Sequence, residues 1–406
     1  MTQKPTILML GCFDTKGEIF SFLRDCLLAQ GAEVVTVNVG AMGSTTLFPI
    51  DVEATKVSET GGGNLEDIRS KNDRGYAMEI MGRGSSEILE ELYKQKKFDA
   101  VIGMGGGSGT YVTLKSMQNL PLGLPKICIS TLASKDLSEQ IGAKDIVMMP
   151  SVVDVAALNS IIKPIIQQAA AAIVAMCGVE VFDKSTTSKR IAISMFGNTS
   201  VCVGFCTDLL EAKGYEVMTF HANGLGGKAM ESLVLEGCFA GVLDITTTEL
   251  ADDLCAGVCS AGGQRLEAAG KLGIPQVVVP GCMDMVNFGT MESVPDKYKN
   301  RQLYSWVPTV TLIRTNAKEN QILGEILAKK LNHATGPTAV LFPERGLSQI
   351  DSEGNVFYNP AVNQILSDSI EKNLNSDIAF INLPLHINEK EFAEKAVETL
   401  MEMMKY

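Results

Sequence analysis

The chain has 406 residues, 46% of them hydrophobic and 20% charged, so it is long enough for two domains that each bury a core. Its formal net charge of −12 at pH 7 argues against nucleic acid and anionic membranes as partners, because a negative surface repels both. With three His and ten Cys, none of them in a Cys-x-x-Cys pair, the sequence predicts no metal site of its own, and such cysteine usage is typical of the reducing cytoplasm.

Apolar strands alternate with helical segments along the first half of the chain. In chain order the pattern predicts strands at 7–10, 34–39, 100–102 and 122–130, helices at 18–29 and 156–177, and a charged, glycine-rich surface loop at 58–75. The segment 156–177 is apolar nearly all round, which predicts a buried helix or, as the alternative, the interface of a homodimer.

The second half of the chain loosely repeats the first. The matched pairs are 6–38 with 189–221, 96–110 with 237–250, and 122–130 with 272–280. Strands that alternate with helices form parallel sheets covered by helices on both faces. The sequence therefore predicts an α/β fold of two doubly wound subdomains related by a pseudo-repeat, residues 1–183 and 184–406, separated at the polar stretch 183–189.

Three small-residue turns follow the strands of the first half, at 11–17, 40–46 and 103–110. In sheets of this kind ligands bind where strands end and helices begin. Glycines let main-chain N–H groups approach an oxyanion, and the helix dipole adds positive potential. These turns predict a phosphate site, and plain tight turns are the alternative.

The glycine-rich run 103–110 fits no common nucleotide motif. It lacks the Gly-Lys-Ser/Thr of a P-loop, and Ser108 stands where the dinucleotide motif requires its third glycine. The pattern alone therefore does not identify the phosphate ligand.

Several motifs in order resemble the Tm-1-like ATP-binding family, also called uncharacterised protein family 0261. They are GCFDTKGEI at 11–19, DRGYAMEIMGRG at 73–84, VIGMGGGSGT at 101–110, HANGLGGKAME from His221, GGQRLEAAGKLGIPQVVVPGCMDMVNFG from Gly262 and TLIRTNAKEN from Thr311. The resemblance covers about residues 5 to 400. It implies two Rossmann-like subdomains, with ATP and a companion Mg²⁺ bound at the strand ends of the first.

Carried across motif by motif, the resemblance implies a set of ATP-binding residues. They are Thr15, Lys16, Gly17, Ser44, Thr45, Arg83, Gly106, Gly107, Ser108 and Gly109. The family usually has Ser at the place of Gly107, and His-Asn-Pro where this chain has Trp306-Val307-Pro308. The second departure indicates a subgroup with a different ligand.

Polar residues also follow the strands predicted in the second half, and they suggest a small-molecule cleft. His221 follows a strand directly and is a candidate general acid or base near neutral pH. Asp244 or Glu249 would orient it, and Arg265 or Arg314 would hold a substrate carboxylate. The candidate catalytic residues are His221, Asp244, Glu249 and Arg265, with a strand-end histidine and ordinary helix caps as the alternative.

Three functions are compatible with these observations. The first is an ATP-binding protein with a second cleft for a small acidic metabolite. The second is an enzyme that hydrolyses, isomerises or cleaves a carbon–carbon bond of a small carboxylate through His221, Asp244 and Arg265. The third is an interaction or inhibitor module whose interface ATP stabilises.

Overall fold

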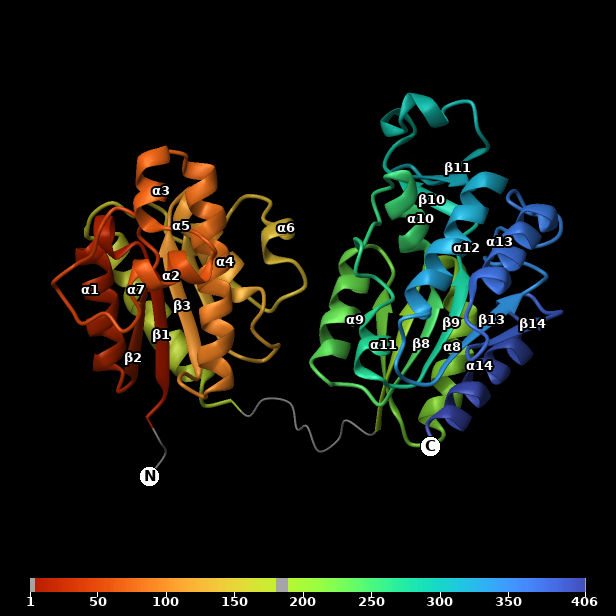
Figure 1. Cartoon of the computed structure of the whole chain (residues 1–406), viewed down its shortest axis with the longest axis horizontal. Helices are drawn as coiled ribbons and strands as arrows, with labels where there is room; N and C mark the ends of the chain where they lie inside the picture. Colours follow the sequence, from red (N-terminus) through yellow and green to blue (C-terminus); the bar gives the residue numbers. More distant parts are fainter. Residues whose placement is uncertain (1–3, 180–188, 406) are drawn as a thin grey trace. The chain divides into compact units, whose positions relative to one another are not determined.

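The computed structural model describes residues 4–179 and 189–405. The chain divides into two compact units, Met1–Phe182 and Asp183–Tyr406 (Figure 1). The stretch 183–189, where the sequence predicts the boundary, lies almost wholly outside the described residues.

The first unit is built on a five-stranded parallel sheet with the order β2-β1-β3-β4-β5. Its strands are β1 (Thr6–Gly11), β2 (Glu33–Asn38), β3 (Ala100–Gly105), β4 (Lys126–Ser130) and β5 (Val147–Pro150). All residues of β3 and β4 are buried, because helices cover both faces of the sheet. Because side chains on both faces of these two strands are buried, their sequences are nearly continuously apolar.

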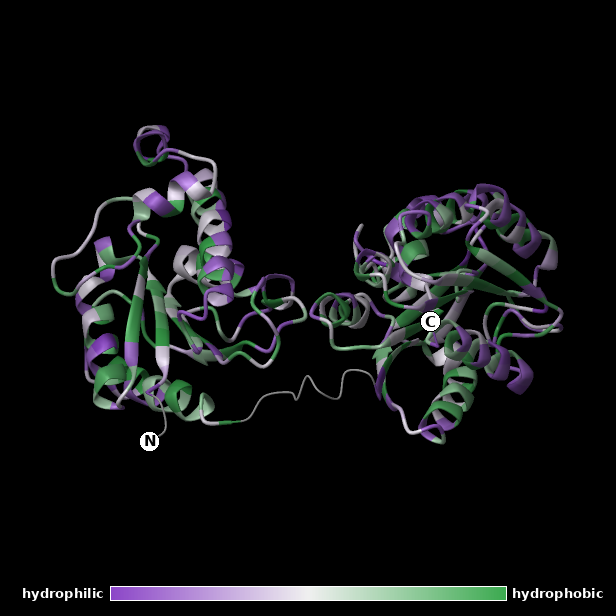
Figure 2. Ribbon diagram, turned by 60° about the horizontal axis from the view of Figure 1, so that its bottom comes forward, coloured by the Kyte–Doolittle hydropathy of each residue, from purple (hydrophilic) through white to green (hydrophobic). Residues whose placement is uncertain are grey.

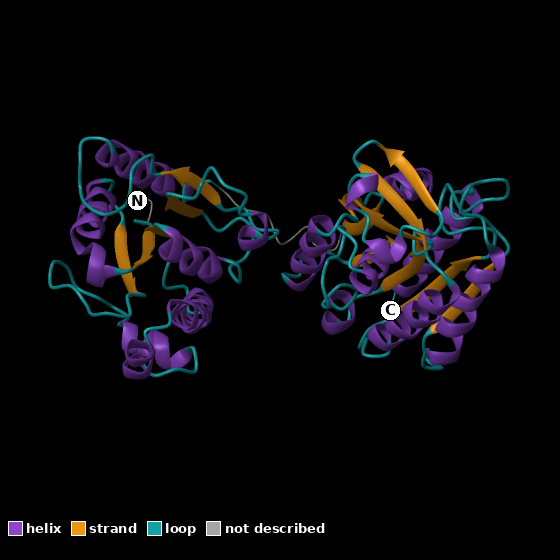
Figure 3. Ribbon diagram, turned by 90° about the horizontal axis from the view of Figure 1, so that it is seen from above, coloured by secondary structure: helices purple, strands orange, loops and turns teal. Residues whose placement is uncertain are grey.

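Helices form a layer on each face of this sheet (Figure 3). One face carries α1 (Phe13–Ala29) and α7 (Ile162–Met176), which pack on side chains such as Ile7 and Ile102. The other face carries α2 (Ala54–Thr60), α4 (Arg74–Lys94) and α5 (Gly107–Met117), which pack on side chains such as Leu8 and Val101. The two further helices are α3 (Leu65–Lys71) and α6 (Ser138–Ile141).

The loop predicted at 58–75 is wrong, because most of this segment is helical. Asn64 caps α3, where its side chain accepts hydrogen bonds from two main-chain N–H groups, and Asp73 caps α4. Ile68 of α3 is 3% exposed and anchors the short helix in the core. The charge and glycine content of the segment therefore led to a wrong prediction for α3 and for the start of α4.

The second unit contains a six-stranded parallel sheet with the order β14-β13-β9-β8-β6-β7. Its strands are β6 (Arg190–Met195), β7 (Glu216–His221), β8 (Gly241–Thr246), β9 (Gln276–Gly281), β13 (Thr338–Pro343) and β14 (Ala379–Leu383). A small antiparallel sheet of order β10-β12-β11 joins β10 (Met285–Phe288), β12 (Val310–Arg314) and β11 (Leu303–Val307).

Helices cover both faces of the six-stranded sheet as well. On one face α8 (Ser200–Glu211) and α14 (Lys390–Met403) pack on alternate strand residues such as Ile191 and Val277. The other face packs against α9 (Leu225–Leu235), α10 (Thr248–Cys255), α11 (Ala268–Leu272), α12 (Ala317–Leu331) and α13 (Pro360–Asn373). The unit also contains the short 3-10 turns η2 (Gly197–Thr199), η3 (Met291–Ser293) and η4 (Asp296–Tyr298). Hydrophobic residues are concentrated on the strands (Figure 2).

The predicted α/β fold, with two doubly wound parallel sheets and a pseudo-repeat, is confirmed. The order β2-β1-β3-β4 of the first unit recurs in the second as β7-β6-β8-β9. In each sheet the next two strands of the chain lie on opposite sides of the first strand, β2 and β3 beside β1, and β7 and β8 beside β6. This reversal of strand order creates a switch point beside β1 and another beside β6. Across the described ranges, no helix combines the length and the apolar character that crossing a bilayer requires.

Candidate functional site

A cavity of about 380 Å³ opens at the C-terminal edge of the first sheet. Its lining includes Thr15 after β1, Gly40 after β2 and Ser108 after β3. These residues surround the switch point of the sheet, which is where doubly wound proteins bind ligands. The structure therefore brings the three turns singled out in the sequence to one cavity.

The N-terminus of α5 borders this cavity and reaches its lining through Ser108. Gly106 is the N-cap and supplies no side-chain cap, and the first main-chain bond of the helix runs from Thr110 N–H to the Gly106 oxygen at 2.8 Å. The N–H groups of Gly107, Ser108 and Gly109 have no acceptor within the described residues. Three free donors and the positive end of an 11-residue helix are suited to bind an anion.

Arg74 places a cation beside this helix terminus. It is the first residue of α4, and its Nε donates to the Ser108 hydroxyl oxygen at 2.6 Å. Its guanidinium is therefore positioned to contact an anion bound at α5. Arg74 lies in the motif 73–84 but is not among the predicted ATP-binding residues; Asp73 before a helical pattern is the N-cap signal that could have located it.

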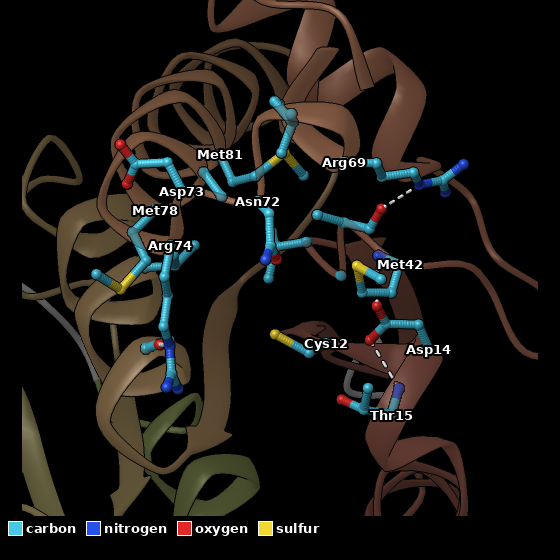
Figure 4. Close-up of a pocket in the computed structure, with 17 residues that line it drawn as sticks. Cys12, Asp14, Thr15, Met42, Arg69, Asn72, Asp73, Arg74, Met78 and Met81 are labelled. Carbon is cyan, nitrogen blue, oxygen red and sulfur yellow. Dashed lines mark hydrogen bonds between the residues drawn. The ribbon is translucent and has the colours of Figure 1, made fainter. Parts of the chain in front are cut away.

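The opposite wall carries a carboxylate that two main-chain groups hold in place. Asp14 accepts the N–H of Thr15 at 2.7 Å and that of Met42 at 2.8 Å. A Cβ on Gly40 would come within 2.2 Å of the Asp14 carboxylate, so only glycine fits there. Figure 4 shows Asp14, Thr15 and Met42 on one side of the cavity and Arg74 on the other.

The remaining lining is largely apolar. Met78, Met81, Ile68 and Val112 contribute to it. Cys12 also lines the cavity, and burial together with the nearby Asp14 raises the pKa of its thiol to about 11, so it stays protonated at neutral pH. The cavity thus combines an anion-binding end with an apolar surface on which a flat ring can lie.

Thr15 and Ser108 are the residues of the predicted ATP set that line this cavity. Several others contact protein groups instead: the Lys16 ammonium donates to the Val155 carbonyl, and Arg83 Nε donates to the Gly61 carbonyl at 2.8 Å. The members of the set outside the lining are Lys16, Gly17, Ser44, Thr45, Arg83, Gly106, Gly107 and Gly109. Their roles in ATP binding stay predictions.

In the second unit Arg265 is not free to hold a substrate, contrary to the prediction. It is 1% exposed and forms two hydrogen bonds to Asp244, at 2.5 and 2.6 Å. Its other N–H groups bind the carboxylates of Glu249 and Glu231 and the Thr246 carbonyl. All five donors of the guanidinium have partners, so Arg265 acts as a buried structural cation.

The predicted pairing of His221 with an acid is also not formed. His221 is exposed at the end of β7, and its ring lies 5.2 Å from that of Phe196. Neither Asp244 nor Glu249 has a hydrogen bond to it in the part of the chain that the structure describes. Both acids are instead bound to Arg265, so the catalytic set of His221, Asp244, Glu249 and Arg265 is not assembled.

Glu249 closes the glycine turn that opens α9. Its Oε1 accepts the N–H of Gly224 at 2.7 Å and that of Gly227 at 3.2 Å. A Cβ on Gly227 would fall 2.2 Å from the Glu249 carboxylate. An internal carboxylate therefore occupies the position that a bound anion would take at α9, whereas no side chain caps the N-terminus of α5.

Among the described residues, no cluster of three or more His, Cys, Asp or Glu side chains has the arrangement of a metal site. Trp306, at the position where the family usually has His-Asn-Pro, lies on β11 and is 37% exposed. Its ring is 6.3 Å from that of Tyr304. The cavity of the first unit is therefore the best-formed candidate site.

Comparison with solved structures yields only weak likenesses. The UDP-GlcNAc 2-epimerase of Methanocaldococcus jannaschii is 11% identical and covers 98% of this chain and 93% of its own, with a TM-score of 0.22. A score this low does not bear on function.

Sequence comparison is decisive for the family. The model of the N-terminal domain of uncharacterised protein family UPF0261 matches residues 5–181, and that of its C-terminal domain matches residues 188–404. A UPF0261 protein of Clostridium tetani is 42% identical over 399 residues, 98% of each chain. The ToMV resistance protein Tm-1 of Solanum lycopersicum is 33% identical over 432 residues, 99% of this chain and 56% of the tomato protein. The resemblance found in the motifs is confirmed: the chain belongs to family UPF0261.

Proposed function

We propose that the cavity of the first unit binds ATP. The observation that carries this proposal is the open N-terminus of α5, where the N–H groups of Gly107, Ser108 and Gly109 lack acceptors beside Arg74. Three free donors, a helix dipole and a guanidinium favour the binding of negatively charged phosphate groups.

The apolar part of the cavity is suited to the adenine ring. Met78 and Met81 of α4 are adaptable side chains that pack well against aromatic rings. Their helix also carries Arg74, so base and phosphates would both contact α4.

Asp14 fits the role of holding a companion Mg²⁺. Each of its carboxylate oxygens accepts one main-chain N–H and retains a further lone pair towards the cavity lining. Hard cations prefer such oxygen ligands next to phosphates, whose negative charge the ion would partly neutralise. The proposal is nucleotide binding and includes no hydrolysis.

Titration of the full-length protein with ATP in an isothermal calorimeter tests the proposal. We expect Arg74→Ala to weaken binding at least about tenfold, since a charge-assisted hydrogen bond contributes roughly 1.5–3 kcal/mol. Arg83→Ala is the matched control, because Arg83 is on the same helix but binds the Gly61 carbonyl outside the cavity lining. Loss of binding in Arg83→Ala with none in Arg74→Ala would contradict the assigned site.

The enzyme hypothesis loses the residues that were to carry it, because Asp244 and Glu249 both accept hydrogen bonds from the buried Arg265. The cleft for a small acidic metabolite, the homodimer, the interaction module and the cytoplasmic location stay predictions.

A further inference from the structure

Unsatisfied acceptors gather around one buried segment of the second unit. Within the described residues, five buried side-chain atoms have no hydrogen-bond partner. Four of them are carboxylate or amide oxygens of the second unit, Asn198 Oδ1, Asp284 Oδ1, Asn287 Oδ1 and Asn320 Oδ1. A buried acceptor without a donor costs about 1–3 kcal/mol, so such a concentration requires an explanation.

Hydrogen bonds place Asp284 and Asn198 next to each other. The hydroxyl of Ser348 donates to Asp284 Oδ2 at 2.8 Å, and the N–H of the following residue, Gln349, donates to the Asn198 carbonyl at 3.0 Å. Asn198 Nδ2 lies 3.9 Å from the sulfur of Met285, the neighbour of Asp284 in the chain. The two side chains therefore reach the same region from β6 and β9.

Asn287, on β10, carries a third of these unpaired buried oxygens. It lies two residues after Met285, so both side chains are on one face of the strand. Its Nδ2 donates to Asp252 at 2.7 Å, while its Oδ1 is unpaired. Asn320 is tied to the same segment through Thr315, whose N–H donates to the Asp284 carbonyl at 3.0 Å.

The region also has more buried negative than positive charge. Asp252, Asp284 and Asp351 are each 0% exposed. Arg314 contacts Asp351 at 3.4 Å but reaches only the main-chain oxygen of Asp284. Buried charges without partners are strongly unfavourable, so the Asp284 carboxylate needs a positive partner or a proton.

The backbone at this place is constrained as well. Cys282 is fully buried and has a φ of +58°, which side chains other than glycine rarely adopt. It directly follows β9 at the C-terminal edge of the sheet, and β8 separates β9 from β6, the strand beside the switch point. Such conformations persist where the surroundings impose them, often at functional sites.

We propose that the second unit binds a hard divalent cation of the Mg²⁺ or Ca²⁺ class, with Asp284 Oδ1, Asn198 Oδ1 and Asn287 Oδ1 as its protein ligands. An all-oxygen set with one carboxylate and neutral amides suits such ions. Two of the three proposed ligands are amides, so the site has a single acidic ligand and contains no cluster of three His, Cys, Asp or Glu side chains. The ion supplies the missing charge and connects the turn after β6 to β10. This proposal does not depend on ATP binding by the first unit.

The test uses full-length protein treated with a chelator and no nucleotide. Equilibrium dialysis against Mg²⁺, Ca²⁺ or Mn²⁺ in physiological KCl, with metal analysis of the protein, should give one bound ion per chain. We expect Asp284→Asn to lower the affinity at least about tenfold, because it removes the charged ligand without changing the shape. Asp296→Asn, in the same unit and with a 93% exposed side chain, should bind as the wild type does.

The same cation-binding measurement on Asn198→Asp is a second test, which applies if Asp284→Asn does not fold. A further negative charge at a ligand position should tighten the binding of divalent ions. Weaker or unchanged binding in Asn198→Asp overturns the proposal. So does a wild type that binds no more cation than Asp284→Asn, since buried water would then be the partner of these oxygens.

Discussion

Arg265 shows how burial determines the role of a charged residue. At the rim of a sheet an arginine can bind a substrate, but this side chain joins β8, α9 and α10 through Asp244, Glu231 and Glu249. Its removal would leave three carboxylates without their cation in a buried place. The expected consequence is loss of stability instead of loss of a substrate contact.

We expect Arg265→Met to destabilise the second unit by about 3–5 kcal/mol, since breaking a buried ion pair leaves uncompensated charge. Urea unfolding of the full-length protein followed by circular dichroism measures this. Lys271→Met is the control, because the Lys271 side chain is 54% exposed in its pair with Glu267 and should change stability by less than about 1 kcal/mol. Equal effects of the two substitutions would contradict the structural role of Arg265.

Asp252 is a second buried acid with a measurable consequence. Burial, the largest cause, raises the pKa of Asp252 to about 7, although hydrogen bonds from Asn287 and Cys259 oppose the shift. The folded protein therefore retains a proton that the unfolded chain, with its ordinary aspartate pKa, releases at lower pH.

The sign of the pH dependence follows from this difference. Because the folded state binds more protons, this group's contribution to stability is full below about pH 4 and is lost as pH rises towards 7. We expect Asp252→Asn to flatten the fall in unfolding free energy of the second unit between about pH 5 and 7. Urea unfolding at several pH values measures the slope, and an unchanged slope in the variant would show that Asp252 is ionised in the folded state.

At the scale of elements, the two units differ in how the N-terminus of a helix that follows a strand is satisfied. In the first unit the turn after β3 leaves the N-terminus of α5 open. In the second unit Glu249 of α10 accepts from the turn that begins α9. Because a helix N-terminus carries partial positive charge, the internal carboxylate satisfies α9, and α5 remains available to a ligand.

The glycines of the open turn have different structural roles, which a matched pair of substitutions separates. A Cβ on Gly105 would lie 2.6 Å from the Gly109 Cα, whereas one on Gly107 would meet nothing within 4 Å. We expect Gly105→Ala to destabilise the first unit by about 1–3 kcal/mol and Gly107→Ala to change stability by less than about 0.5 kcal/mol. Thermal or urea unfolding measures both, and a destabilised Gly107→Ala would mean that the turn is more crowded than the structure shows.

At the scale of the whole molecule, each unit has the cores that a separate domain needs. The first buries side chains on both faces of its sheet against α1 and α7 and against α4 and α5. The second does the same with α8 and α14 on one face and α12 and α13 on the other. Both units have a size typical of independent domains.

We therefore expect fragments 1–182 and 183–406 to fold separately. Each should give a cooperative unfolding transition in urea, monitored by circular dichroism, because its core lies within the fragment. A fragment that unfolds without a cooperative transition would show that its stability requires the other unit.

Much of the fold could be predicted from the sequence, since apolar runs such as 100–105 and 190–195 become buried strands wherever helices cover both faces of a sheet. The helix α3 and the start of α4, which fall within 58–75, were missed because a capping bond depends on one side chain, such as Asn64, and not on periodicity. The turns that line the candidate site were found, because glycines after strands are a local signal.

The sequence by itself determined the family, the alternation of strands and helices, the repeat and the position of the glycine turns, because these depend on order and composition along the chain. Only the tertiary structure decided which polar residues are available to a ligand. Arg74 and Arg265 are both arginines outside the strands, yet one contacts the open terminus of α5 and the other has carboxylates around it. That difference arises from residues distant in sequence, such as Ser108 and Asp244, and distance in the chain carries no information about contact in space.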